Sequence, residues 1–233
     1  MGRRIAAIIR HGDYHQTPSA PSALQPYPLN TTGEQQAQAA ATTINTLLSD
    51  NPWQLVSTID CSQPLRGWQT ADIIATALST NSEESIKVES FDALAERSVG
   101  AAANLTSAQI RAVIERDPRY PELPQGWKSD SHFRLPLQGA ESLLEAGARV
   151  AEHITQQLNA LPEQQEDQLK LFVGHGAAFR HAAYRLGVLE YEQIAKLSMY
   201  HADPILIEQL RDGRWQRIAG EWKVRSATSA YKD

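Results

Sequence analysis

The sequence Arg4-Ile5-Ala6-Ala7-Ile8-Ile9, followed at once by Arg10-His11-Gly12-Asp13, sets the pattern for the whole chain. An apolar run rich in β-branched residues and bounded by glycine predicts a short buried strand. The pattern recurs downstream, where Leu169-Lys170-Leu171-Phe172-Val173-Gly174 precedes His175-Gly176. Two predicted strands therefore each end on a histidine beside a glycine. Ligands of open α/β sheets bind outside the carboxyl ends of the strands, so we expect the two histidines to meet there.

Composition narrows the class of protein. The chain has 233 residues, of which 42% are hydrophobic, enough to bury a full core. Its net charge of −5 provides no basic field, so nucleic acid is not an expected partner. No apolar stretch approaches the roughly 20 residues that span a bilayer, and the first strand leaves no room for a signal peptide. The single cysteine, Cys61, excludes an intrachain disulfide, and we expect a cytoplasmic protein without a membrane partner.

Helical and strand patterns alternate along most of the chain. A proline-rich loop over 14–28 leads to a helix capped by Asn30 or Thr31, and Thr31 with Glu34 fits a capping box. Further strands are predicted at Leu55–Ile59 and Ile86–Phe91, and an edge hairpin at 204–207 and 215–218. Further helices are predicted from about Arg66, over Ser107–Arg116, over 143–161 and from Ala177 to Gly187, and the tail after Lys223 is expected to fray. We expect an α/β three-layer sandwich with a mostly parallel central sheet and helices on both faces.

This alternation stops between Glu96 and about Gly139. The stretch contains one clear helix and four prolines, but its aromatic residues are too many for a disordered segment. Long connections in compact domains are usually lids or binding loops. We therefore predict one domain over residues 1–233 with a cap-like insertion at about 97–138. Its candidate substrate contacts are Arg97, Trp127, Lys128 and Arg134.

The residues at the two strand ends suit phosphoryl chemistry. A neutral imidazole is nucleophilic at pH 7, so His11 could attack phosphorus directly. Guanidinium groups match the oxygens of a transferring phosphoryl group, which makes Arg10 and Arg66 candidate ligands. His175 supplies a further donor, and amides near Gly176 open a helix that favours an anion.

These residues resemble the histidine phosphatase superfamily, the phosphoglycerate-mutase-like proteins. Besides Arg10-His11-Gly12 and Gly174-His175-Gly176, the stretch Pro28–Ala37 resembles the family's P-L-T-x-x-G-x-x-Q-A. The stretch Ser62–Ala71 resembles S-P-L-x-R-A-x-Q-T-A, and Leu94-Ala95-Glu96-Arg97 resembles the L-x-E-R segment that carries the proton donor. The matches occur in the family's order and cover most of the chain.

The resemblance implies a set of roles. His11 would accept the phosphoryl group as a phosphohistidine, while Arg10, Arg66, His175 and Gly176 would bind its oxygens. Glu96 would protonate the leaving oxygen and then deprotonate water, because Gly176 occupies the place of the donor in the other branch of the family. Thr17 stands where relatives often carry an asparagine phosphate ligand. No metal or other cofactor is implied, and inorganic phosphate would be the product.

Several alternatives remain open. Phosphoglycerate mutase-type phosphoryl transfer would use the same residues, and a non-catalytic phospho-ligand sensor would lack the acid. A metal hydrolase could use His11, Asp13, His15 and His175 as ligands. Arg66 could also be a surface residue, and Glu96 a solvated carboxylate. The substrate could be a small phosphorylated molecule or a phosphoprotein, and the edge hairpin offers a surface for a homodimer.

Overall fold

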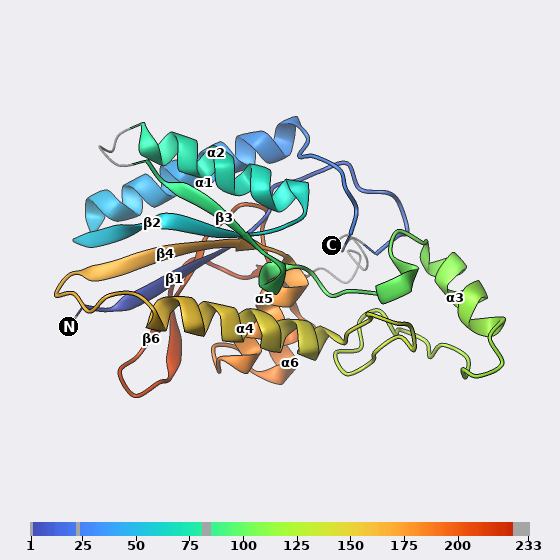
Figure 1. The fold of residues 1–233 in the computed structure, drawn as a ribbon. Coiled ribbons are helices and arrows are strands. Elements are labelled where there is room, and N and C mark those ends of the chain that lie inside the picture. The colour runs from blue at the N-terminus through green and yellow to red at the C-terminus, as the bar shows by residue number, and fades with distance from the viewer. Residues whose placement is uncertain (1, 22–23, 81–84, 226–233) are drawn as a thin grey trace.

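The fold is built on a six-stranded sheet in the order β3-β2-β4-β1-β6-β7 (Figure 1). The computed structural model describes residues 2–21, 24–80 and 85–225. Neighbouring strands among β1 to β4 are parallel, whereas β6 and β7 are antiparallel additions at one edge. The strands are β1 (Arg4–Arg10), β2 (Trp53–Ser62), β3 (Lys87–Phe91), β4 (Asp167–Gly174), β6 (Ile205–Gln209) and β7 (Trp215–Ala219). The predicted mostly parallel sheet is confirmed.

Helices cover both faces of this sheet, as expected. In Figure 1, α1 (Thr31–Asp50) and α2 (Leu65–Ser79) lie on one side, and α4 (Leu143–Asn159) and α5 (Gly176–Arg185) on the other. The alternation of side chains along β1 divides the core: Ile5 and Ile9 join the cluster under α1 and α2, while Ile8 joins the cluster under α4 and α5. No helix within the described residues is both long and apolar enough to cross a membrane.

Strand register brings the two histidines together. β1 and β4 are parallel neighbours in which Arg10 lies opposite Gly174. The residues that follow them, His11 and His175, therefore leave the sheet side by side, and the His11 amide donates to the Gly174 carbonyl at 2.9 Å. β2 ends next to β4 on its other side, with Cys61 opposite Val173, which places Ser62 at the same edge.

The predicted cap contains a small hydrophobic cluster of its own. Helix α3 (Ser107–Glu115) buries Ile110 and Ile114 against Leu123, Trp127 and other residues of the insertion. Figure 1 shows this part of the chain beyond the carboxyl ends of the strands, on the side where α5 begins. A 3₁₀ turn at Asp92–Leu94 leads into it from β3, and a second one spans Gly100–Ala102.

Some sequence expectations need correction. β2 is twice as long as the predicted Leu55–Ile59, because its half-buried first residues also pair with β4. Asn30 caps α1 by accepting from the Gly33 amide, so the capping box expected for Thr31 is wrong. Helix α6 (Tyr191–Ile194) and the small β5–β8 pair (Leu197–Ser198 with Lys223–Val224) were not expected. Lys223–Val224, at the start of the tail that was expected to fray, is therefore paired in a strand. The rest of that prediction, residues 226–233, lies outside the described residues.

Candidate active site

The centre of the site is a buried guanidinium between two imidazoles. Arg66 Nε donates to His11 Nε2 at 3.3 Å, and its Nη2 lies 3.4 Å from His175 Nδ1. The two rings are 5.0 Å apart between centroids. All three side chains are buried, so the alternative of a surface arginine at position 66 is wrong. Two imidazoles and a guanidinium at this separation can surround one tetrahedral oxyanion.

Hydrogen bonds select the tautomer of each histidine. His11 Nδ1 lies 2.7 Å from the Gly12 carbonyl, which can only accept, so Nδ1 carries the proton and Nε2 the lone pair. His175 Nδ1 faces the donating Arg66, so Nε2 carries the proton and donates to Ser62 Oγ at 3.0 Å. His11 therefore presents an unprotonated nitrogen toward Arg66.

Burial and positive neighbours keep these histidines neutral. Desolvation, followed by the charges of His175, Arg66 and Arg10, lowers the pKa of His11 well below its usual 6.5. Desolvation, followed by Arg66, Arg10 and Arg149, lowers the pKa of His175 in the same direction. A neutral imidazole at physiological pH is the form that can act as a nucleophile.

Arg10 lies at the start of α5. Its Nη1 donates to the Met199 carbonyl at 3.1 Å. A Cβ on Gly176 would come within 3.2 Å of Arg10 Cδ, so the glycine lets the guanidinium pack against the first turn of the helix. Arg10 and Gly176, both predicted phosphate ligands, thus touch each other beside His175.

Glu96 lies at the same helix end, on the side of the cap. Its Oε2 accepts from the Ala177 amide at 3.1 Å and its Oε1 from the Arg97 amide at 2.9 Å. The Glu96 side chain is half-buried. Burial lowers the pKa of Arg66, and the charges of Tyr14 and Glu96 raise it again in part. Glu96 is therefore not a freely solvated carboxylate, and it borders the cluster of His11, Arg66 and His175.

A pocket of about 400 Å³ opens next to Glu96. The cap and the start of α5 line it together, with Arg97, Lys128 and Ala177 among its residues. Arg180, His181 and Arg225 add further basic or aromatic surface. A cavity of this size lies in the range of small-molecule pockets.

Other predicted site residues lie elsewhere. Trp127 is buried in the cap cluster, where the Arg97 guanidinium sits 5.7 Å from its ring centroid, and Arg134 is exposed and pairs with Glu145. Neither lines the pocket. The Thr17 amide donates to Gln25 Oε1, and its hydroxyl donates to Tyr27. Arg66 donates to the Gln25 carbonyl, so Gln25 links Thr17 to Arg66. Direct roles for these three residues stay predictions.

Two polar residues of the site were missed in the sequence. Ser62 supplies the hydrogen bond that orients His175. His201 Nδ1 donates to the His11 carbonyl at 2.8 Å, with its ring 5.6 Å from that of His11. The position of Ser62 at the end of a predicted strand could have identified it, whereas nothing in the local sequence marks His201. Across the described ranges, no three histidine, cysteine, aspartate or glutamate side chains are grouped to hold one metal ion.

A family comparison agrees with this geometry. The model of the histidine phosphatase superfamily, branch 1, matches residues 6–219. The chain belongs to this superfamily. The match extends from β1 to β7, so one histidine phosphatase region carries every element of the sheet. No match was found among curated proteins.

Several solved structures share this fold. The mycobacterial glucosyl-3-phosphoglycerate phosphatase has a TM-score of 0.68 at 21% identity, over 96% of this chain and 100% of its own. Its complex with inorganic phosphate gives 0.65 at 22%, over 99% and 100%. Bacillus stearothermophilus YhfR gives 0.68 at 19%, over 95% and 98%. At these identities the likeness concerns the fold.

Proposed function

We propose that this histidine phosphatase is a metal-independent phosphomonoester hydrolase that acts through a phosphohistidine on His11. The observation that carries the proposal is the buried contact of Arg66 with both His11 and His175, with Glu96 at its border. His11 Nε2 carries the lone pair that attacks phosphorus, since its Nδ1 proton is engaged by Gly12. The resulting P–N bond replaces the bond from phosphorus to the leaving oxygen.

Positive charge for the transferring group comes from the protein. Arg10 and Arg66 supply fixed positive donors near His11, which suit the charge on the phosphoryl oxygens. His175 would add a donor in the tautomer that carries its proton on Nδ1, the atom that faces Arg66. Arg66 Nε donates to His11 Nε2, so a phosphoryl oxygen of bound substrate would take over this N–H and leave the His11 lone pair free to attack phosphorus.

Glu96 acts as the acid and then as the base. It protonates the leaving oxygen in the first step, and the resulting carboxylate takes a proton from the water that breaks the P–N bond. General acid assistance of this kind contributes about 10²–10⁴-fold. The substrate is a small phosphorylated molecule, because its leaving group must enter the 400 Å³ pocket beside Glu96.

The nucleophile can be tested by trapping. Wild-type protein mixed with ³²P-labelled phosphomonoester and quenched in alkali should carry acid-labile label, and His11→Ala should lose both label and turnover. Arg185→Ala is a matched control on the exposed end of α5. Label that persists on His11→Ala would refute the assignment.

The same assay separates the alternatives. Turnover that a chelator abolishes would favour the metal hydrolase, and tight phosphate binding without turnover would favour the sensor. Transfer of label to a second hydroxyl rather than to water would favour the mutase. We expect release of inorganic phosphate that a chelator does not change.

A further inference from the structure

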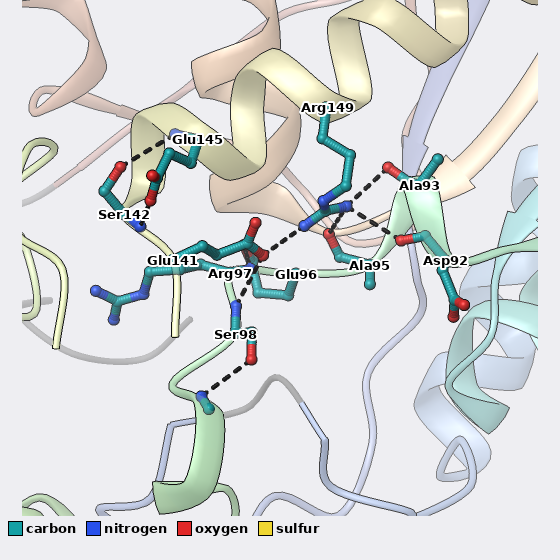
Figure 2. A network of polar contacts seen from close by, with 11 residues as sticks. Asp92, Ala93, Ala95, Glu96, Arg97, Ser98, Glu141, Ser142, Glu145 and Arg149 are labelled. Carbon is teal, nitrogen blue, oxygen red and sulfur yellow. Dashed lines mark hydrogen bonds and ion pairs between the residues drawn. The ribbon is translucent and has the colours of Figure 1, made fainter. Parts of the chain in front are cut away.

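The segment that carries Glu96 has little regular structure of its own. Between β3 and the cap, the only regular element in residues 92–98 is the 3₁₀ turn Asp92–Leu94, which the Ala95 amide closes by donating to the Asp92 carbonyl. A carboxyl group on such a segment depends on outside contacts for its position. Figure 2 shows that these contacts come from Arg149 on α4 and Glu141 just before it.

Arg149 binds the part of the segment that precedes Glu96. Its Nη1 donates to three backbone carbonyls, at 3.1 Å to Asp92, 2.8 Å to Ala93 and 3.2 Å to Ala95. Its Nη2 donates to Glu141 Oε1 at 2.6 Å. The guanidinium thus binds three backbone carbonyls around one 3₁₀ turn and a carboxylate at the same time.

Glu141 binds the part of the segment that follows Glu96. The same Oε1 that receives Arg149 accepts from the Ser98 amide at 3.0 Å, and the Glu141 amide donates to the Ser98 carbonyl at 3.0 Å. The bridge between Val99 and Ala140 continues this pairing. Glu96 is therefore held from both sides by one connected ion pair, which we call the Arg149–Glu141 clamp.

The clamp rests on a rigid support. Ser142 and Glu145 form a reciprocal capping box at the start of α4, directly after Glu141. α4 packs along α5, whose Ala177 amide binds Glu96 Oε2. The side chains of Arg149 and Glu141 are 28% and 20% exposed, so solvent screens their interaction only in part.

We infer that Arg149 and Glu141 are positioning residues that set the Glu96 carboxyl group for proton transfer. The inference rests on the proposed role of Glu96 as proton donor. A general acid must lie within about 2.6–3.2 Å of the oxygen that it protonates. Displacement by about 1 Å can cost about 10²-fold, so loss of the clamp lowers acid catalysis while the hydrogen bonds among His11, Arg66 and His175 stay in place.

The test compares two leaving groups. p-Nitrophenolate leaves readily without a proton, whereas the alkoxide of glycerol 2-phosphate needs one, so the ratio of kcat/KM for glycerol 2-phosphate to that for p-nitrophenyl phosphate reports on acid catalysis. The ratio is independent of the amount of folded enzyme. We expect Arg149→Met to lower it by tenfold or more, with less than about threefold loss on p-nitrophenyl phosphate.

Conservative variants sharpen the expectation. Glu141→Gln keeps an Oε1 acceptor for Ser98 and Arg149 and should keep the ratio within about threefold, whereas Glu141→Ala should lower it as Arg149→Met does. Arg3→Met is the matched control, since it removes an ion pair of 2.7 Å with Asp167 at the opposite end of the sheet. It should leave the ratio unchanged.

The double variant Arg149→Met/Glu96→Gln decides whether the clamp acts through Glu96. If it does, the ratio of the double variant equals that of Glu96→Gln alone, because effects on one catalytic unit are not additive. If the ratio is unchanged in Arg149→Met but strongly lowered in Glu96→Gln, the positioning role is wrong and the proton-donor role of Glu96 stands. An unchanged ratio in Glu96→Gln would overturn the proposed proton donor, and the inference with it.

Discussion

Arg66 shows how one side chain connects the parts of the site. Among the described residues it is the largest side chain without solvent exposure, and it reaches His11, His175 and the Gln25 carbonyl. Its guanidinium carbon also lies 4.6 Å from the ring centroid of Tyr14. A guanidinium in such surroundings stays charged even though burial lowers its pKa. The site therefore carries a permanent positive charge between its two imidazoles.

Replacing Arg66 by methionine should affect both rate and pH dependence. Loss of a phosphoryl clamp should lower kcat/KM by about 10²–10³-fold. Removal of a positive neighbour also favours the imidazolium form of His11, so its pKa rises toward 6.5 and the acid limb of kcat/KM moves to higher pH.

The measurement is a pH profile of kcat/KM with one substrate for both proteins, which cancels the titration of the substrate itself. Arg185→Met, at the exposed end of α5, should leave rate and profile unchanged. An acid limb at lower pH than that of the wild type would contradict the electrostatic account.

Residue identities at the two strand ends were predictable because strand, histidine and glycine are adjacent in sequence. His11, His175 and Arg66 do come together as expected. Their supporting contacts were not predictable. His201 reaches the His11 carbonyl across 190 positions of sequence, from a turn that β6 brings beside β1. Such contacts depend on the register of strands, which no local pattern encodes.

At the scale of elements, the start of α1 is pressed against the turn after β1. Asn30 caps the helix and donates its side-chain amide to Asp13 Oδ2 at 2.9 Å. Gly33, in the first turn of the helix, faces the backbone of Gly12 and Asp13 so closely that a Cβ on either glycine would overlap the other segment. The two glycines allow the contact that fixes the turn bearing His11.

Gly33→Ala should therefore destabilise the protein, although alanine in a helix normally stabilises by about 1 kcal/mol relative to glycine. We expect a lower Tm and a lower kcat, because Asp13 must move and His11 precedes it by two residues. Thermal unfolding and steady-state kinetics measure both. Gln38→Ala, on the exposed side of α1, should leave both nearly unchanged, and an increased Tm for Gly33→Ala would disprove the steric argument.

Helices and strands with a strong apolar period were predictable from the sequence, whereas the extent of the other elements depends on the elements that pack beside them. α4 follows its apolar spacing closely and carries the expected face toward the sheet. β2 extends beyond its apolar residues because β4 offers it partners. The fold of the cap could not be predicted, because its proline-rich segment has no regular apolar period. Its conformation is set by tertiary contacts, such as those of Trp127 and Leu123 in the cap cluster.

For the whole molecule, three buried histidines (His11, His175 and His181) and the half-buried His201 make stability depend on pH. Burial, as the largest cause, lowers the pKa of His181 and of His201 to about 4, and it lowers those of His11 and His175 as well. Below pH 6.5 the unfolded chain binds protons that the folded protein does not. The free energy of unfolding must therefore fall as pH is lowered from about 6.5 toward 4.

Urea unfolding at pH 7 and pH 5 should show this loss. His181→Gln should reduce the difference between the two pH values by up to about 2 kcal/mol, because one buried group no longer competes for a proton. His15→Gln, at an exposed position, should leave the difference unchanged. A protein that is equally stable at both pH values would contradict the buried neutral state of these histidines.

The position of β4 in the sheet has a consequence for synthesis. Although it is the fourth strand along the chain, β4 lies between β1 and β2, so these two N-terminal strands have no ladder with each other. A nascent chain that ends before residue 167 has no partner for the facing edges of β1 and β2, and it contains His11 without His175. Pairing of β4 with both strands closes these two edges and brings His175 beside His11 in one event, so the two histidines can meet only after β4 has been synthesised.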